Sequence, residues 1–268
     1  MKEAPSHARD YSSISPSALS LLLMKAQTSL PFAKQAAELI YGHAAPADLA
    51  ETMKGGGATR NLKHFQKRYR SLDTLLRECA LPHVLEIGAG LSFRGLELAR
   101  TSATHYIDSD LPEIAQLKAS LVARLCPEPL VGTLDVRALD ALDAEAFEAT
   151  VERLPKGPVA IVNEGLLIYL DQQEKERLAR HVRTALRRRG GVWLTGDVYI
   201  RNPADYPSVF AEPTARAFLD RHRVDENKFS SWAAAERFFE ANGFAIQRRL
   251  VPEHSRHVRQ SWALSAAP

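Results

Sequence analysis

HVLEIGAGLSFRG, residues 83–95, is the stretch that decides the fold of this chain. An apolar run over 84–87 stops at Gly-x-Gly, and a helical pattern begins directly after it. A buried strand, a glycine turn and a helix start are typical of the first nucleotide-binding turn of a doubly wound α/β sheet. Gly88 and Gly90 allow the backbone to adopt positive φ angles and to approach a ligand closely.

The residues around the two glycines indicate which kind of nucleotide the turn binds. A dinucleotide fingerprint has a third glycine three residues after the second, and Phe93 occupies that position. No Gly-Lys-Ser/Thr follows, so a P-loop is excluded. Glu86 precedes the first glycine and would repel a diphosphate, so it favours a cationic ligand. Glu-x-Gly-x-Gly at a strand end resembles the S-adenosylmethionine turn of class I methyltransferases.

Two acids follow the second predicted strand, in the segment THYIDSDLP of residues 104–112. A nucleotide-binding sheet places a carboxylate about twenty residues after the glycine turn, where it accepts ribose hydroxyls. Asp108 and Asp110 both fit this role by position. One of them also fits as the cap of the next helix, whose first turn contains Pro112.

Composition limits the classes of protein that this chain can belong to. Its 35 Lys and Arg against 32 acids give a net charge of +3, which is too balanced to indicate nucleic-acid binding. Cys79 and Cys126 are isolated, so neither a disulfide framework nor a zinc site is expected. Residues 1–13 lack the apolar core of a signal peptide, and no apolar stretch reaches membrane-spanning length. We therefore expect a cytoplasmic protein that binds neither nucleic acid nor membrane.

From Val84 onward, strand and helix patterns alternate, which predicts an α/β fold with a largely parallel sheet. The predicted strands are 84–87, 104–108, 130–134, 159–163, 192–197, 244–251 and 259–265. Seven strands ending in an antiparallel hairpin predict the Rossmann-like sheet of class I methyltransferases. We predict a helical cap over residues 1–80, with a flexible break at 55–57, and a cofactor-binding domain over 81–268. Residues 198–232 are expected to be largely irregular and to form much of the acceptor pocket.

Four segments in order resemble the leucine carboxyl methyltransferase family, and within it the tetracenomycin-type polyketide carboxyl O-methyltransferases. They are VLEIGAGLSFRGLELA, YIDSDLPEIAQLK, LDVRALD and VAIVNEGLLIYL. The N-terminal ISPSALSLLLMKAQTSLPFAKQAAEL is similar to the same branch. The resemblance implies S-adenosyl-L-methionine as cofactor and assigns cofactor-binding roles to ten residues: Lys25, Arg68, Glu86, Gly88, Gly90, Asp108, Asp110, Asp135, Val136 and Glu164.

The resemblance also assigns each group a part of the cofactor. The glycines face the methionine part, and Asp110 or Asp108 holds the ribose. Asp135 and Val136 match an Asp-Leu pair that holds the adenine, although Asp135 also fits as a turn residue. Glu164 lies near the methionine amino group, while Lys25 and Arg68 match basic residues that pair with the methionine carboxylate.

The chain departs from the family pattern just after the glycine turn. Ser92 and Phe93 stand where the family often has Asp-Thr, and Glu97 stands at the place of a second arginine. Arg94 keeps the first arginine. These departures disfavour the protein-tail substrate of the phosphatase methyltransferases.

The resemblance implies an O-methyltransferase that converts the carboxylate of a small organic acid into a methyl ester. An ionised carboxylate is already a nucleophile, so we name no catalytic base. Acceptor-binding candidates are Arg94, Tyr169, Asp197, Tyr199 and Arg201. Three alternatives remain open, namely a phenol or alcohol acceptor, a nicotinamide oxidoreductase, and a non-catalytic module that docks on a carrier protein. His254, Arg256, His257 and Arg259 are expected to form a basic surface edge, and no metal site is expected.

Overall fold

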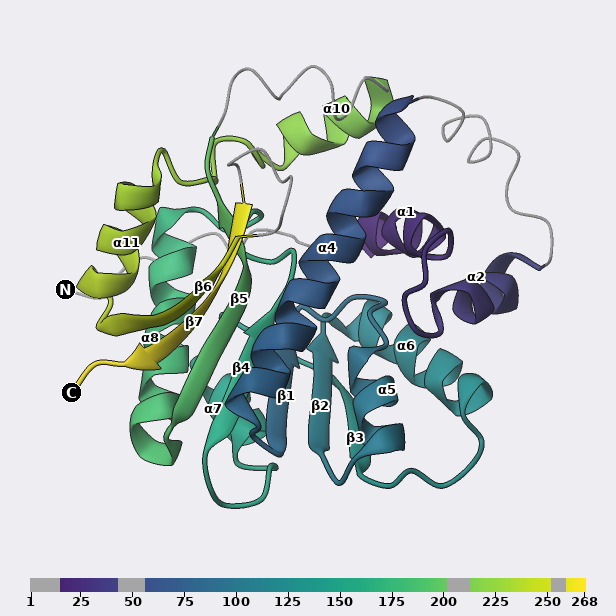
Figure 1. The fold of residues 1–268 in the computed structure, drawn as a ribbon, viewed down its shortest axis with the longest axis horizontal. Coiled ribbons are helices and arrows are strands. Elements are labelled where there is room, and N and C mark those ends of the chain that lie inside the picture. Colours follow the sequence, from purple (N-terminus) through teal and green to yellow (C-terminus); the bar gives the residue numbers. More distant parts are fainter. Residues whose placement is uncertain (1–14, 43–55, 202–212, 252–258) are drawn as a thin grey trace.

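The computed structural model describes residues 15–42, 56–201, 213–251 and 259–268 (Figure 1). Their central element is a seven-stranded sheet of order β3-β2-β1-β4-β5-β7-β6. The strands are β1 (His83–Ile87), β2 (His105–Asp110), β3 (Thr133–Ala138), β4 (Val159–Asn163), β5 (Gly191–Tyr199), β6 (Phe244–Leu250) and β7 (Arg259–Ala266). Strands β1 to β5 are parallel, and β7 is antiparallel to both of its neighbours. The predicted sheet and its antiparallel end are confirmed.

Helices cover both faces of this sheet (Figure 1). One face packs against α7 (Ala144–Val151), α8 (Gln172–Arg189) and α11 (Trp232–Ala241). The opposite face packs against α4 (Gly56–Cys79), α5 (Arg94–Thr101) and α6 (Pro112–Leu125). Two N-terminal helices, α1 (Ser15–Lys25) and α2 (Ala33–Tyr41), lie against α4 and α6, and α10 (Pro213–Arg221) follows β5 in the chain.

Helix α4 belongs to the same hydrophobic core as the strands. Leu72, Leu75 and Leu76 form one buried cluster with strand residues that include Val84 and Leu194. Gly56 and Gly57 of the expected break instead begin this helix, and residue 55 lies outside the described residues. The domain boundary between residues 80 and 81 stays a prediction. Helix α4, which precedes this boundary, packs against the strands that follow it.

The third strand begins later than its apolar pattern indicates. Leu130 and Val131 suggested a strand over 130–134, but pairing with β2 begins at Thr133. Val131 is 66% exposed. At Gly132 the backbone passes so close to Thr104 that a Cβ would lie 2.2 Å from the Thr104 carbonyl oxygen. The strand thus starts at Thr133, directly after this close crossing, and ends at Ala138.

Two local features fix the loops at the carboxyl edge of the sheet. Helix α8 starts with a capping box in which Asp171 accepts the Glu174 N–H and the Glu174 side chain accepts the Asp171 N–H. Helix α10 was not predicted, because its sequence lies in the stretch expected to be irregular. Phe218 of α10 contacts the Tyr169 ring in the β4–α8 loop, with ring centroids 6.3 Å apart.

None of the described helices is long and apolar enough to span a membrane.

Candidate functional site

The glycine turn lies directly beyond β1 and has room above it. Gly88 and Gly90 have φ angles of 61° and 51°, which glycine adopts without steric cost. A Cβ at Gly90 would meet no atom within 4 Å, whereas one at Gly88 would lie 3.3 Å from the Leu166 side chain. The backbone at Gly90 is therefore open to a ligand.

The structure separates the two acids that the sequence left equal. Asp110 lies beside the glycine turn, where its carboxylate accepts the Gly90 N–H at 2.7 Å and the Leu111 N–H at 2.8 Å. Asp108 is fully buried below this edge and forms an ion pair with Lys118 at 2.7 Å. Burial raises the pKa of Asp108 to about 6, and Lys118 partly opposes this shift. Of the two acids, Asp110 is therefore the one that lies at the glycine turn.

Arg94 organises a buried group of charges beneath the turn. Its guanidinium binds Glu86, Asp73 at 2.9 Å and Glu164 at 2.8 Å, and it is 2% exposed. Glu86 also accepts the Tyr106 hydroxyl at 2.5 Å. Arg94 therefore already has three carboxylate partners, so its interactions hold β1, α4 and the β4–α8 loop together.

Glu164 is shared between two arginines at the end of β4. It accepts Arg68 Nε at 3.0 Å in addition to Arg94. Burial alone would raise the pKa of the Glu164 carboxyl, but Arg68, Lys25 and Arg94 outweigh burial and hold that pKa well below its usual range. Glu164 is consequently ionised at neutral pH and can attract a ligand ammonium group.

Lys25 ends α1 close to the same charges. Its side chain is buried, with Nζ 5.9 Å from the centre of the Tyr69 ring. Among the described residues, no carboxylate lies within ion-pair distance of it. Burial lowers the pKa of Lys25 to about 8, and Glu164 only partly opposes this. A ligand carboxylate would supply the missing counter-charge.

A hydroxyl and an imidazole complete the side of the site next to β5. The Tyr199 hydroxyl lies 3.1 Å from Arg68 Nη1 and 3.0 Å from His64 Nε2. Burial, together with Arg259 and Arg68, lowers the pKa of His64 to about 3. His64 is therefore neutral at physiological pH and a weak base. The sequence reading missed His64 and Asp73 because nothing in the pattern of α4 marks them as different from other polar helix residues.

Asp197 orders the loop that carries Glu164. Its buried carboxylate accepts Asn163 Nδ2 at 2.7 Å and the backbone N–H groups of residues 165–167 at 2.6–3.1 Å. Trp193 in turn donates to Asn163 Oδ1 at 2.8 Å. These contacts make Asp197 a residue that positions the site, whereas the sequence reading placed it among acceptor-binding candidates.

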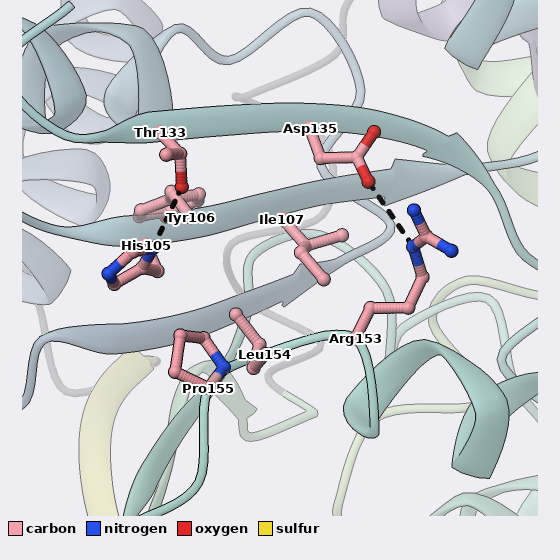
Figure 2. A pocket seen from close by; sticks show the side chains of 8 residues that line it. All are labelled: His105, Tyr106, Ile107, Thr133, Asp135, Arg153, Leu154 and Pro155. Atoms are coloured by element: carbon pink, nitrogen blue, oxygen red, sulfur yellow. Dashed lines mark hydrogen bonds and ion pairs between the residues drawn. The ribbon is translucent and has the colours of Figure 1, made fainter.

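Asp135 and Val136 lie inside β3, before the edge where Asp110 lies. Asp135 pairs in register with Ile107, and its carboxylate binds Arg137 at 2.5 Å and Arg153 at 3.4 Å. Figure 2 shows Asp135 and Arg153 lining a shallow pocket on one face of the sheet. The structure does not bring Asp135 to the glycine turn.

Asp140 stands at the strand end instead. The Leu139 N–H donates to the Asp110 carbonyl at 2.8 Å, so Asp140 directly follows a residue that is hydrogen-bonded to Asp110. Asp140 is exposed and accepts the Leu142 N–H at 2.9 Å. The sequence analysis did not single out Asp140, because the match to the family's Asp-Leu pair pointed to Asp135 and Val136; β3 ends at Ala138, two residues before Asp140.

The remaining acceptor candidates lie around the same edge. Tyr169 is half-buried against Phe218 and His222. Arg201 is exposed and donates to the backbone carbonyls of Asp225 and Glu226 at 3.1 and 2.7 Å. The part of the expected acceptor segment at 202–212, and the basic residues at 254, 256 and 257, lie outside the described residues. In the described part, no group of His, Cys, Asp and Glu side chains is arranged to hold a metal ion.

Comparisons with known proteins agree with the cofactor site that this geometry describes. The model of the leucine carboxyl methyltransferase family matches residues 14–183. A protein of Mycobacterium tuberculosis named "putative S-adenosyl-L-methionine-dependent methyltransferase" is 30% identical over 185 residues, covering 66% of this chain and 54% of its own. The chain thus spans about half the length of the curated relatives it matches. The match does not separate the tetracenomycin-type branch from the rest of the family.

Solved structures with the same fold are more distant in sequence. Magnesium protoporphyrin IX methyltransferase from Synechocystis, with S-adenosylhomocysteine bound, superposes with a TM-score of 0.54 at 12% identity, covering 88% of this chain and 95% of that one. The mitomycin 7-O-methyltransferase superposes with a TM-score of 0.51 at 12% identity, covering 94% and 67% of the two chains. These likenesses show the class I methyltransferase fold.

Proposed function

The chain belongs to the leucine carboxyl methyltransferase family, and from that premise we propose that it transfers the methyl group of S-adenosyl-L-methionine to an oxygen of a small organic acid. The observation that carries the proposal is the set of charges around the glycine turn. An ionised Glu164, a buried Lys25 without a carboxylate partner in the described part of the chain, and Asp110 beside an open Gly90 are complementary to an amino acid joined to a ribose.

Each side chain of the site has a distinct task toward this cofactor. Asp110 accepts the ribose hydroxyls, and Glu164 faces the ammonium group. Lys25 and Arg68 bind the methionine carboxylate, and Asp140 replaces Asp135 as the acceptor for the adenine amine. When bound, S-adenosyl-L-methionine supplies a methyl group already activated by a sulfonium.

The acceptor is proposed to be a carboxylate, because among the described residues of the site His64 is a poor base and Lys25, whose pKa is lowered to about 8, is assigned to the cofactor carboxylate. A phenol or alcohol must lose a proton as it attacks, whereas an acid with a pKa near 4 is ionised beforehand. His64 is the imidazole nearest to the charge cluster, and with a pKa of about 3 it accepts a proton poorly at neutral pH. The protein therefore has to orient the carboxylate and exclude water rather than move a proton.

The same observations support an oxidoreductase or a non-catalytic module less well. The nicotinamide oxidoreductase is set aside because the matching family is one of methyltransferases. A non-catalytic module would not need the charged side chains of Lys25 and Glu164 to be positioned for a ligand. We propose a small carboxylic acid as partner, with neither nucleic acid nor a membrane taking part.

The chemical nature of the product tests the acceptor assignment. Purified protein is incubated with methyl-labelled cofactor and a panel of aromatic and aliphatic carboxylic acids and phenols, and the extracted product is treated with mild alkali. A methyl ester is hydrolysed and releases labelled methanol, whereas an aryl methyl ether is stable. At saturating cofactor concentration, we expect alkali-labile product whose formation rate is nearly flat from about pH 6 to 9. An alkali-stable product would show that the acceptor is a hydroxyl.

A further inference from the structure

Arg259 is a buried arginine that none of the assigned roles uses. It is the first residue of β7, and it pairs in register with Tyr199 at the end of β5. Directly opposed residues of an antiparallel pair share a face of the sheet, so its side chain lies on the face where Tyr199 contacts Arg68 and His64. Arg259 is 0% exposed, which corrects the expectation that it belongs to a basic surface edge.

The guanidinium of Arg259 has two nitrogens without a hydrogen-bond partner. Nη1 donates to the Ser261 hydroxyl at 3.0 Å, whereas Nε and Nη2 are buried and unpaired. Nε–H and Nη2–H point from the same edge of the guanidinium. That edge is the one that binds a carboxylate with two parallel hydrogen bonds.

No described carboxylate neutralises this cation. Burial lowers the pKa of Arg259, although Tyr199 and the carboxylates of Glu164 and Asp197 act in the opposite direction. Glu164 is held by Arg68 and Arg94, and Asp197 by Asn163 and backbone N–H groups. A buried charge without a partner is unfavourable for folding, so its presence points to an anionic ligand.

The proposed cofactor does not supply that anion. It carries one carboxylate, for which Lys25 and Arg68 are already placed. We propose that Arg259 binds the carboxylate of the methyl acceptor through Nε and Nη2, an inference that rests on the proposed function. Arg259 is then the residue that selects acids from neutral molecules of the same shape.

The same pairing accounts for release of the product. The new bond joins a carboxylate oxygen to the methyl carbon, and the methyl–sulfur bond breaks, leaving a thioether. The negative charge of the acceptor and the positive charge of the sulfonium disappear together, and no proton moves. A neutral ester no longer forms an ion pair with Arg259, so it binds more weakly than the acid does.

Thermal unfolding of the ligand-free protein separates this role from a purely structural one. Arg259→Met removes an uncompensated buried charge, so we expect a melting temperature equal to or above that of the wild type. Arg248→Met is the matched control, because Arg248 is an exposed arginine whose ion pair with Glu78 contributes little. A large fall in melting temperature for Arg259→Met alone would assign the arginine to folding and overturn the proposal.

Ligand titrations then test the chemistry. Calorimetry of the protein saturated with S-adenosylhomocysteine measures binding of benzoate, octanoate and uncharged benzamide. We expect at least one acid to bind, and Arg259→Gln to weaken it about tenfold or more, while binding of S-adenosylhomocysteine stays as in the wild type. Arg259→Lys should be intermediate, because lysine keeps the charge and loses the two parallel hydrogen bonds.

Each other result has a defined meaning. Loss of S-adenosylhomocysteine binding in Arg259→Gln would place Arg259 in the cofactor site and overturn the proposal, as would acid binding that is unchanged by the substitution or absent from the wild type. If the acids bind through Arg259 and the methylated product is alkali-stable, the acid site stands and the carboxyl assignment fails. If an ester forms equally well without Arg259, the function stands and this inference fails.

Discussion

Replacing Glu164 by glutamine tests the charge cluster most directly. The carboxylate lies 3.0 Å from Arg68 Nε and 2.8 Å from Arg94 Nη2, and all three side chains are buried. Arg94 would keep Glu86 and Asp73, but Arg68 would have no carboxylate partner left among the described residues and would keep the Tyr199 hydroxyl. Removing one partner of a buried pair costs about 3–5 kcal/mol. For a chain of this size, that corresponds to a fall in melting temperature of roughly 6–20 °C.

A second variant separates stability from binding. Replacing Arg68 by methionine and Glu164 by leucine removes both charges, and an apolar pair of similar volume is often as stable as a buried ion pair. We expect the double variant to recover much of the melting temperature lost by Glu164→Gln. Both variants should bind S-adenosylhomocysteine about tenfold to a hundredfold more weakly than the wild type, because the ammonium group loses a charged acceptor.

The measurements are circular dichroism during heating and calorimetry with S-adenosylhomocysteine. Glu174→Gln serves as the control for a glutamate-to-glutamine change, since Glu174 caps α8 away from the cluster. Wild-type melting temperature together with wild-type affinity in Glu164→Gln would refute the reasoning. It would mean that neither the ion pairs nor the ammonium contact exists as described.

Three further predictions concern the cofactor site. Gly90→Ala should fold with a small loss of stability, of about 1–2 kcal/mol, because alanine is unfavourable at a positive φ. It should weaken S-adenosylhomocysteine binding by more than tenfold in calorimetry, because its Cβ enters the open space beside the turn. Unchanged affinity would remove Gly90 from the site. The pKa of Lys25 is lowered to about 8, and a ligand carboxylate favours its charged form, so the affinity for S-adenosylhomocysteine should fall as pH rises from 7 to 9.5. Lys25→Met should bind S-adenosylhomocysteine more weakly, and its affinity should change less with pH. Identical pH profiles for the two proteins would argue against the contact. Asp140→Ala should weaken binding about fivefold or more, and Asp135→Ala, whose ion pairs are partly exposed, should change it little; the reverse order would restore the assignment to Asp135.

The sequence predicted those parts of the fold that depend on short-range patterns. The apolar run 84–87, the glycine turn and the alternation of strands and helices were sufficient for the sheet and for the antiparallel end. The start of β3 was not predictable in this way, because it lies next to the contact between Gly132 and Thr104. These residues are far apart in the sequence and meet only in the folded chain. Asp135 was assigned from its match to the family's Asp-Leu pair, and its place inside β3 rather than after it was not visible in that match.

Burial explains the differences at the site. Asp197 was predicted to face an acceptor because it lies at the carboxyl end of a strand, and Arg94 because its charge could pair with an acceptor carboxylate. The structure shows that both are fully engaged with other residues. Conversely, Arg259 was expected at the surface, and its burial depends on the pairing of β7 with β5. Chemistry at strand ends was predictable from sequence, whereas the partners of each charge were not.

The position of β7 has a consequence for how the protein is synthesised and handled. In chain order β7 follows β6, yet in the sheet it lies between β5 and β6, and β6 has no other neighbour. During synthesis β6 therefore emerges before the strand it needs, and β5 keeps an unpaired edge until β7 is inserted. Cutting the chain before Arg259 would remove an interior strand rather than trim the margin of the sheet. It would leave two exposed strand edges that invite aggregation, so affinity tags and truncations that disturb β7 endanger solubility before they affect activity.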